Sequence, residues 1–186
     1  MKKLLFPLII AFLAVSCSNN NLKKQFDCNK KHEFTELKEY NDFLKHFKVE
    51  LPNHWKTNLY YDDYSSEIFS ADTTKGLSNS YILDIAWRQG ELTIDDLFSN
   101  SLKDSLQLKE QLQTVKSGQT VFKKLPGFWN LSKGEKSGYT YNYLQVFVKT
   151  KPDEYITLTT KVYGDENVDE RLCESIFLFE NLEISK

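Results

Sequence analysis

Residues 81–98, YILDIAWRQGELTIDDLF, change their apolar period halfway along and so decide the fold class. Every second residue from Tyr81 to Trp87 is apolar, which predicts a strand with one face in a core, ended by Gln89-Gly90. Thr93 then suits the N-cap of a helix, and Asp96 stands at the matching capping-box position. An amphipathic helix of about twenty residues is expected there, packed on a sheet by one apolar face. That face consists of Ile94, Leu97, Phe98, Leu102, Leu112 and Val115.

The rest of the chain reads as strands joined by short turns, with a helix near each end. Apolar and charged residues alternate over 47–51, which predicts a strand that ends at Pro52. The apolar residues of 34–44 are three or four positions apart, which predicts a short helix. Residues 139–148 are apolar on both faces, which predicts a central strand covered on both sides. Further strands are expected over 55–61, 67–71, 119–124, 128–135, 139–149, 155–163 and 182–184, with a last helix after Asn167.

This order predicts an α+β fold, an antiparallel β-sheet flanked by helices in an α/β/α sandwich. A closed lipocalin-like barrel is the alternative, but a long helix in mid-chain fits it badly. The segment FKVELPNHW, residues 47–55, resembles the opening of the PsbP/Mog1-like group, with its alternating strand, Leu-Pro, two residues and Trp. The later order is similar as well, over about residues 45–185. The resemblance implies helices on both faces of a central sheet, in proteins that mostly bind or assemble and share no catalytic residues.

The first seventeen residues have the pattern of a bacterial lipoprotein signal. A basic start precedes an apolar run, residues 4–15, which is shorter than the roughly 20 residues that span a bilayer. Ala14-Val15-Ser16-Cys17 resembles the lipobox, in which signal peptidase II cuts before a cysteine that carries diacylglycerol, although Ala14 stands where Leu is usual. An ordinary signal peptide with a chance cysteine is the alternative. We expect a signal peptide (1–16), a lipidated tether (17–27) and a single globular domain (28–186).

Lipid attachment at Cys17 would hold the protein permanently at a membrane, because two or three acyl chains anchor far more strongly than one. No acidic residue directly follows Cys17, which favours a periplasm-facing protein. We expect it to be lipid-anchored in the bacterial cell envelope, in the outer membrane, with the inner membrane as the alternative. Removing residues 1–16 leaves 22 basic and 26 acidic side chains, a net charge of −4. Nucleic acid is therefore not expected as a partner. Anionic headgroups should weakly repel such a chain, so the lipid rather than a basic patch is expected to anchor it.

With Cys17 assigned to lipid, Cys28 and Cys173 remain as an even pair in an oxidising compartment. A disulfide between them would join the start of the domain to its last helix. Two unpaired cysteines are the alternative. Cys28 and His32 have the spacing of a metal pair, but a zinc site needs three or four ligands, and the sequence holds no second cluster. Neither a metal nor a cofactor is expected.

The sequence offers little catalytic chemistry. The three histidines, at positions 32, 46 and 54, accompany no nucleophile or metal motif, so no enzyme activity is expected. Tyr60, Tyr61 and Tyr64 gather at a predicted hairpin tip, and Trp129 ends a second aromatic turn. Exposed Tyr and Trp are common binding anchors, although strand packing also explains them. We expect a membrane-anchored, non-enzymatic binding or assembly module with an envelope protein partner. A small periplasmic hydrolase is the alternative, and it would show a concave pocket with converging polar groups.

Overall fold

The structure, a computed structural model, describes residues 20–30 and 32–185, so Cys17 and the predicted signal peptide lie outside it. The strands are β1 (Leu37–Asn41), β2 (Phe47–Pro52), β3 (Lys56–Tyr61), β4 (Ser65–Ala71), β5 (Tyr81–Gln89), β6 (Gln113–Phe122), β7 (Leu125–Lys136), β8 (Tyr139–Lys151), β9 (Glu154–Tyr163) and β10 (Glu183–Ile184). The helices are α1 (Leu22–Gln25), α2 (Asp96–Glu110) and α3 (Val168–Phe179), with one 3-10 turn, η1 (Leu77–Asn79).

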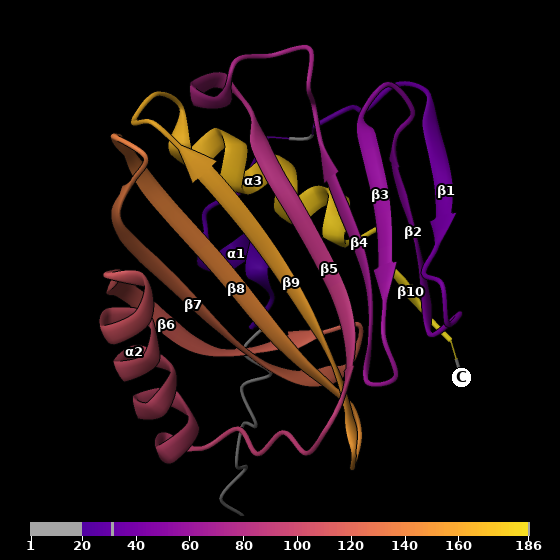
Figure 1. Cartoon of the computed structure of the whole chain (residues 1–186), viewed down its shortest axis with the longest axis vertical. Helices are drawn as coiled ribbons and strands as arrows, with labels where there is room; N and C mark the ends of the chain where they lie inside the picture. The colour runs from indigo at the N-terminus through magenta and orange to yellow at the C-terminus, as the bar shows by residue number, and fades with distance from the viewer. Residues whose placement is uncertain (1–19, 31, 186) are drawn as a thin grey trace, which may run out of the picture.

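Two antiparallel sheets form the centre of the molecule (Figure 1). The main sheet has seven strands in the order β3-β4-β5-β9-β8-β7-β6, and the small sheet has the order β1-β2-β10. The alternation in residues 81–87 is confirmed, because Tyr81, Leu83, Ile85 and Trp87 are all buried in the largest core cluster.

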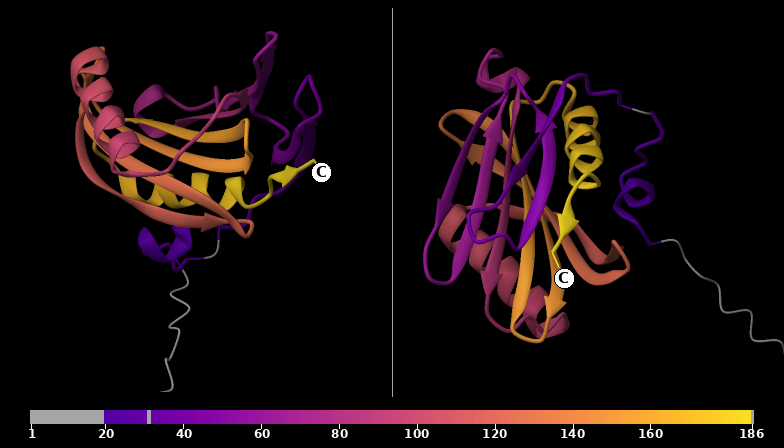
Figure 2. Two further views of the ribbon diagram at one scale, coloured as in Figure 1. Left: turned by 90° about the horizontal axis from the view of Figure 1, so that it is seen from below. Right: turned by 90° about the vertical axis from the view of Figure 1, so that its right-hand side faces the viewer.

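Helices cover the two faces of the main sheet, as an α/β/α sandwich requires (Figure 2). On one face, Ile176 and Phe179 of α3 are fully buried in the core formed with β5, β8 and β9. On the other face, Phe98 of α2 packs edge-on against Phe128 and Phe147. β8 therefore contributes to both cores, which confirms the prediction of a central strand covered on both sides. The second helix covers only the β6–β8 end of its face.

The long helix is shorter than the sequence predicts. Asp95 rather than Thr93 caps it, because the Asp95 carboxylate accepts a hydrogen bond from the Phe98 amide at 2.8 Å. At the other end Gln111 adopts a left-handed conformation with φ 56°, and residues 113–122 continue as β6. The apolar spacing that assigned Val115 to the helix is therefore fortuitous, because Val115 is an exposed strand residue.

The predicted helix over 34–44 is wrong, because the chain forms β1 there instead. Glu36 has a positive φ of 55°, which interrupts a helix, and β1 then pairs along its length with β2. β1 is mostly exposed to solvent, so it lacks the buried face that gives a strand its alternation of apolar and polar residues. Pairing with β2 thus overrides the local apolar spacing.

The N-terminal boundary of the folded domain also differs from the prediction. Residues 20–27 were expected to belong to a tether, but α1 packs on the domain and Leu22 is only 3% exposed. The Asn20 carbonyl accepts hydrogen bonds from the Val121 amide (3.0 Å) and the Thr120 hydroxyl (2.8 Å). The polar composition suggests a solvated segment, but buried Leu22, these hydrogen bonds and the Cys28–Cys173 disulfide hold it on the domain.

Candidate binding face

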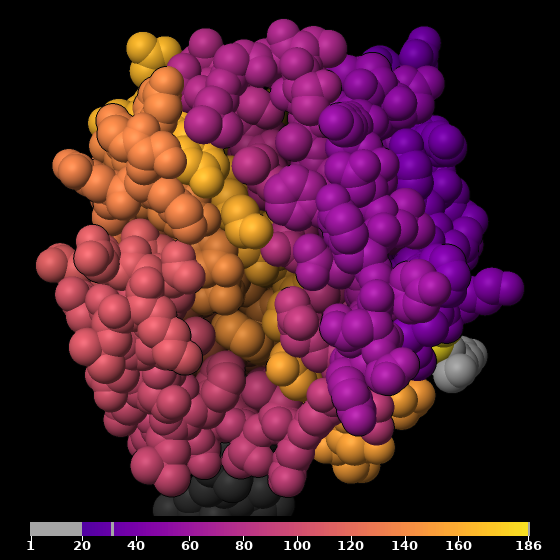
Figure 3. Space-filling view, in the orientation of Figure 1, coloured from indigo at the N-terminus to yellow at the C-terminus, as the bar shows by residue number. Residues whose placement is uncertain are grey.

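The main sheet leaves a hollow between α2 and the β3–β4 hairpin (Figure 3). Side chains alternate along a strand, so Asp84 and Arg88 point into this hollow because Leu83 and Ile85 point into the α3 core. Residues that are paired across neighbouring strands lie on the same face of the sheet, so the partners of Asp84 and Arg88 and the residues on the same face of those strands also line the hollow. We call this surface the concave face. Its floor consists of Glu67, Phe69, Asp84, Arg88, Tyr143, Gln145, Thr157, Thr159 and Lys161.

The charged groups of the floor are paired. Lys161 Nζ lies 2.9 Å from the Asp84 carboxylate and 5.2 Å from the centre of the Phe69 ring. Arg88 lies 3.8 Å from Glu67, and all four charged side chains are partly buried. Two cations and two anions cancel, so the floor is polar without a net charge. Such a surface suits a partner that supplies both donors and acceptors rather than a polyanion.

Burial shifts the ionisation of two groups in the floor. The pKa of Glu67 is raised, mainly by desolvation and next by the negative charge of Asp84. Burial, together with the negative charges of Asp84 and Glu110, raises the pKa of Tyr143 to about 12, despite a hydrogen bond with Thr159. Tyr143 is therefore a neutral hydroxyl at physiological pH. It can both donate and accept a hydrogen bond at the floor.

Tyrosines form the rim of the concave face on the β3 side. Tyr60 pairs with Glu67 in the β3–β4 register, so its side chain extends a floor row to the edge of the sheet. Tyr61 points the other way and stacks on Phe43, with ring centroids 3.7 Å apart. Tyr64, in the turn, is 67% exposed. The predicted aromatic tip is thus present at the surface, and Tyr60 joins it to the charged floor.

Trp129 is not a surface anchor, which corrects the prediction made from its turn-like sequence. Residues 126–129 lie inside β7, so Trp129 points into the α3 core and is 5% exposed. The Phe26 ring lies edge-on to it at 4.8 Å. Gly127 suggested a turn, but it is needed within the strand, because a Cβ there would lie 2.8 Å from the Phe147 carbonyl oxygen.

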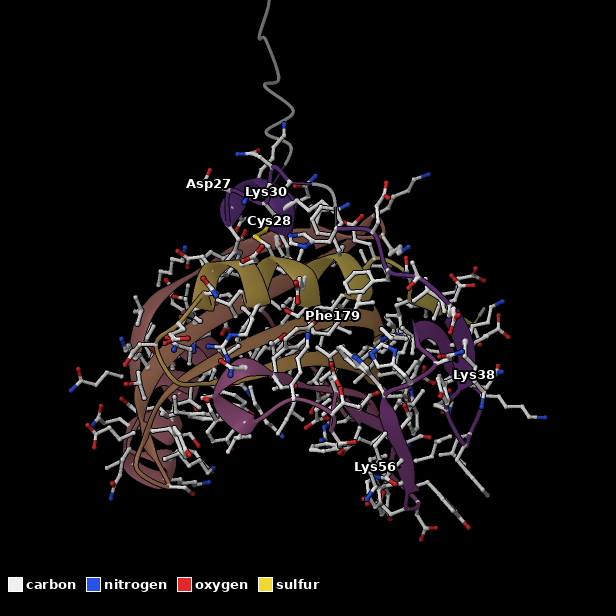
Figure 4. The ribbon with its side chains drawn as sticks, turned by 90° about the horizontal axis from the view of Figure 1, so that it is seen from above. Asp27, Cys28, Lys30, Lys38, Lys56 and Phe179 are labelled. Carbon is white, nitrogen blue, oxygen red and sulfur yellow. A yellow bond between two sulfur atoms is a disulfide. The ribbon has the colours of Figure 1, made fainter. Side chains whose placement is uncertain are left out.

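The two cysteines lie on the opposite side of the sheet from the concave face. Cys28 and Cys173 form a disulfide, with sulfur atoms 2.04 Å apart, that ties the N-terminal segment to α3. Figure 4 shows Cys28 and Lys30 outside α3, and Lys56 of β3 beyond the sheet on the other side. Cys17 lies outside the described residues, three positions before Asn20.

The histidines are scattered and none lies in the floor. His32 is near Glu174 (3.7 Å), His54 is near Asp72 (3.8 Å), and His46 stacks on Trp87 with ring centroids 3.7 Å apart. Within residues 20–30 and 32–185, no three His, Cys, Asp or Glu side chains are grouped to hold a metal. His46 and Trp87 instead line a cavity of about 560 Å³ at the end of the sheet near β10.

Sequence reasoning missed the charged floor. Asp84 and Arg88 are visible in the sequence as the polar positions of an alternating strand, which usually face solvent. Arg88 meets Glu67 across the successive strands β4 and β5, whereas Asp84 meets Lys161 across β5 and β9, whose paired residues are more than 60 positions apart. The sequence shows only that three separately predicted strands each carry charged residues on their polar side. It does not show that these residues meet.

Comparison with known proteins bears on the fold. No protein-family model and no curated protein sequence matches the chain. Among solved structures, cyanobacterial PsbP (CyanoP) from Synechocystis sp. PCC 6803 is similar, with a TM-score of 0.58 at 10% identity over 84% of this chain and 96% of CyanoP. The Ran-binding protein Mog1p of Saccharomyces cerevisiae gives 0.49 at 11% identity, over 80% of this chain and 95% of Mog1p. LpqN of Mycobacterium tuberculosis, involved in cell envelope biogenesis, gives 0.45 at 11% identity, over 91% and 99%. The chain has the predicted α+β fold of a PsbP-like domain.

Proposed function

We propose that this protein is a membrane-anchored lipoprotein of the bacterial cell envelope that binds an envelope protein through its concave face, without enzyme activity. The observation that carries the proposal is the hollow itself. A charge-balanced floor lies open between α2 and β3, and exposed tyrosines form one rim. Tyrosine contributes a large, rigid contact area, and partly buried charge pairs give specificity once a partner excludes water.

The position of the N-terminal segment supports membrane attachment on the other side of the molecule. Asn20 and α1 lie outside α3 and β6, and the concave face opens away from them (Figure 2). A lipid on Cys17 would therefore leave the concave face directed away from the membrane, into the periplasm beneath the outer membrane. Within residues 20–30 and 32–185, no helix is long and apolar enough to cross a bilayer.

Two experiments test the proposal. A photoreactive amino acid at Tyr60 or Tyr64 should crosslink the chain to one discrete envelope protein in intact cells. The control is Lys30, an exposed residue outside α3 on the opposite side of the sheet from the concave face (Figure 4). Equal crosslinking from all three positions, or none, contradicts a specific face. Separately, Cys17→Ala should move the protein from the membrane fraction to the soluble envelope fraction, and continued membrane binding contradicts the lipid anchor.

Glu67 beside Asp84 also fits the alternative of a small hydrolase, because a carboxyl group whose pKa is raised is common in acid–base catalysis. A hydrolase would lose turnover in the Glu67→Gln variant and would keep its crosslinks. A binding module would show weaker crosslinking from Tyr60 in the same variant, because the neighbouring charge pair with Arg88 is lost.

A further inference from the structure

The β6–β7 hairpin has an unusual turn. Its two connecting residues, Lys123 and Lys124, both have positive φ, 50° and 69°. Turns of this kind favour Asn-Gly, because a side chain is strained in the left-handed region. The neighbouring β7–β8 hairpin has the same pattern with Ser137-Gly138, at φ 53° and 78°. The first hairpin thus keeps two lysines where ordinary turn chemistry would select against them.

This hairpin lies where the chain enters the folded domain. Asn20 is hydrogen-bonded to Thr120 and Val121, only two to three residues before the turn. Cys17 is only three positions before Asn20 in the sequence, so the proposed lipid is attached close to this contact along the chain. The disulfide at Cys28 keeps the whole segment against α3.

Positive charge gathers at the same place. Residues 20–27 and 119–125 contain four lysines and one acidic residue, Asp27, within a mature chain of net charge −4. The lysines are Lys23 and Lys24 of α1 and the two of the turn. Glu180 pairs with Lys23 at 2.7 Å, whereas Lys123 meets only the Glu180 backbone carbonyl. Although the mature chain is acidic overall, the fold brings the lysines of α1 and of the β6–β7 turn together into a local basic surface.

We propose that α1 and the β6–β7 turn bind the anionic headgroups of the membrane that holds the Cys17 lipid, and so orient the domain with its concave face outward. This inference rests on the lipid anchor proposed above. The lipid supplies attachment, and the lysines fix which side faces the bilayer. Each lysine close to an anionic surface favours the orientation that brings it there by about fivefold over the other orientations. The two turn lysines together should favour that orientation by about thirtyfold.

The test uses the lipidated, full-length mature protein in vesicles that carry a nitroxide-labelled lipid as quencher. Cys17 is lipidated and the other cysteines are bonded, so Val121→Cys gives a single labelling site beside the turn, where Val121 is 50% exposed. Leu97→Cys on α2, 78% exposed, gives the same label on the other side of the molecule. Vesicles are pure phosphatidylcholine or contain phosphatidylglycerol. We expect stronger quenching at position 121 with phosphatidylglycerol than with phosphatidylcholine alone, the increase being reversed by salt, and little quenching at position 97.

The variant K123N/K124G separates the lipid role from a structural one. Asn-Gly suits the turn, so its melting temperature should equal or exceed that of the wild type, while quenching at position 121 should fall several-fold. The control K38N/K56N removes two exposed lysines that lie away from α1 (Figure 4) and should leave quenching unchanged. If K123N/K124G is quenched like the wild type, or if positions 121 and 97 are quenched equally, the inference is wrong. If the wild type does not float with vesicles at all, the lipid anchor itself fails.

Discussion

Replacing both Cys28 and Cys173 by serine should detach the N-terminal segment and destabilise the whole domain. The disulfide joins residues 145 positions apart. For a loop of that length, the chain-entropy model gives roughly 5 kcal/mol of stabilisation, as an upper value. In a domain of this size, each kcal/mol corresponds to about 2–4 °C, so the melting temperature should fall by roughly 10–20 °C.

The segment itself should undock before the domain unfolds. Burial of Leu22 stabilises the docked state by about 2 kcal/mol, and the two hydrogen bonds to the Asn20 carbonyl add about 1 kcal/mol each. Ordering the eight backbone residues 20–27 costs at least about 8 kcal/mol. These three contacts alone fall short by a few kcal/mol, and the disulfide makes up the difference together with the packing of Phe26 on Trp129 and the Gln25–Gln119 hydrogen bond.

Hydrogen exchange followed by mass spectrometry measures both effects in one sample. In the double-serine variant, the amides of residues 20–27 and the Val121 amide should exchange fast, while α3 stays protected below the melting temperature. Wild-type protein in reductant should behave in the same way. Slow exchange over residues 20–27 in the variant, or a loss of less than about 1 kcal/mol in urea unfolding, would refute this reasoning. Two free thiols in the native protein would refute the pairing.

Three further predictions concern the core and the concave face. Arg171 is buried and donates to four backbone carbonyls, so Arg171→Met should cost about 3 kcal/mol in urea unfolding because it leaves them unpaired (Ser78, Ser80, Tyr163 and Glu166). The pKa of Glu67 is raised in the folded state, so the protonated carboxyl group favours folding. This contribution to the free energy of unfolding is complete below the unfolded pKa of about 4, and it is lost as pH rises through the folded pKa. Glu67→Gln should therefore gain stability relative to the wild type as pH rises through that range, and a flat difference between pH 4 and 7 would contradict the assignment. Gly127→Ala should lower the melting temperature, with a cost of about 1–3 kcal/mol, because the new methyl group meets the Phe147 carbonyl oxygen at 2.8 Å. A melting temperature equal to the wild type's would show that β7 can shift.

The elements predicted best from the sequence are those with one fully buried face. Residues 81–87 and 155–163 alternate because every second side chain enters the α3 core, and both strands are present as predicted. β1 lacks such burial, so its spacing resembled a helix by chance. The end of α2 was misplaced for a related reason, because Leu112 is buried just after the helix and extends its apolar pattern.

The candidate site was predicted only in its local part. The exposed tyrosines of the β3–β4 tip follow from a turn signature within a few residues. The charged floor depends on the pairing of β4, β5 and β9, which no local pattern records. Trp129 was placed at the surface because Pro126-Gly127 looks like a turn, whereas the long pairing of β7 with β8 carries it into the core.

The docked N-terminal segment has a second consequence, for solubility. β6 is an outer strand of the main sheet, and such strands offer unpaired backbone groups to other molecules. The contacts of Asn20 with Val121 and of the Gln25 amide with the Gln119 carbonyl (3.1 Å) occupy part of that edge. Reduction of the disulfide would uncover it. A chain whose disulfide is reduced would therefore expose a strand ready to pair with a second copy, and self-association would be the first sign of that reduction.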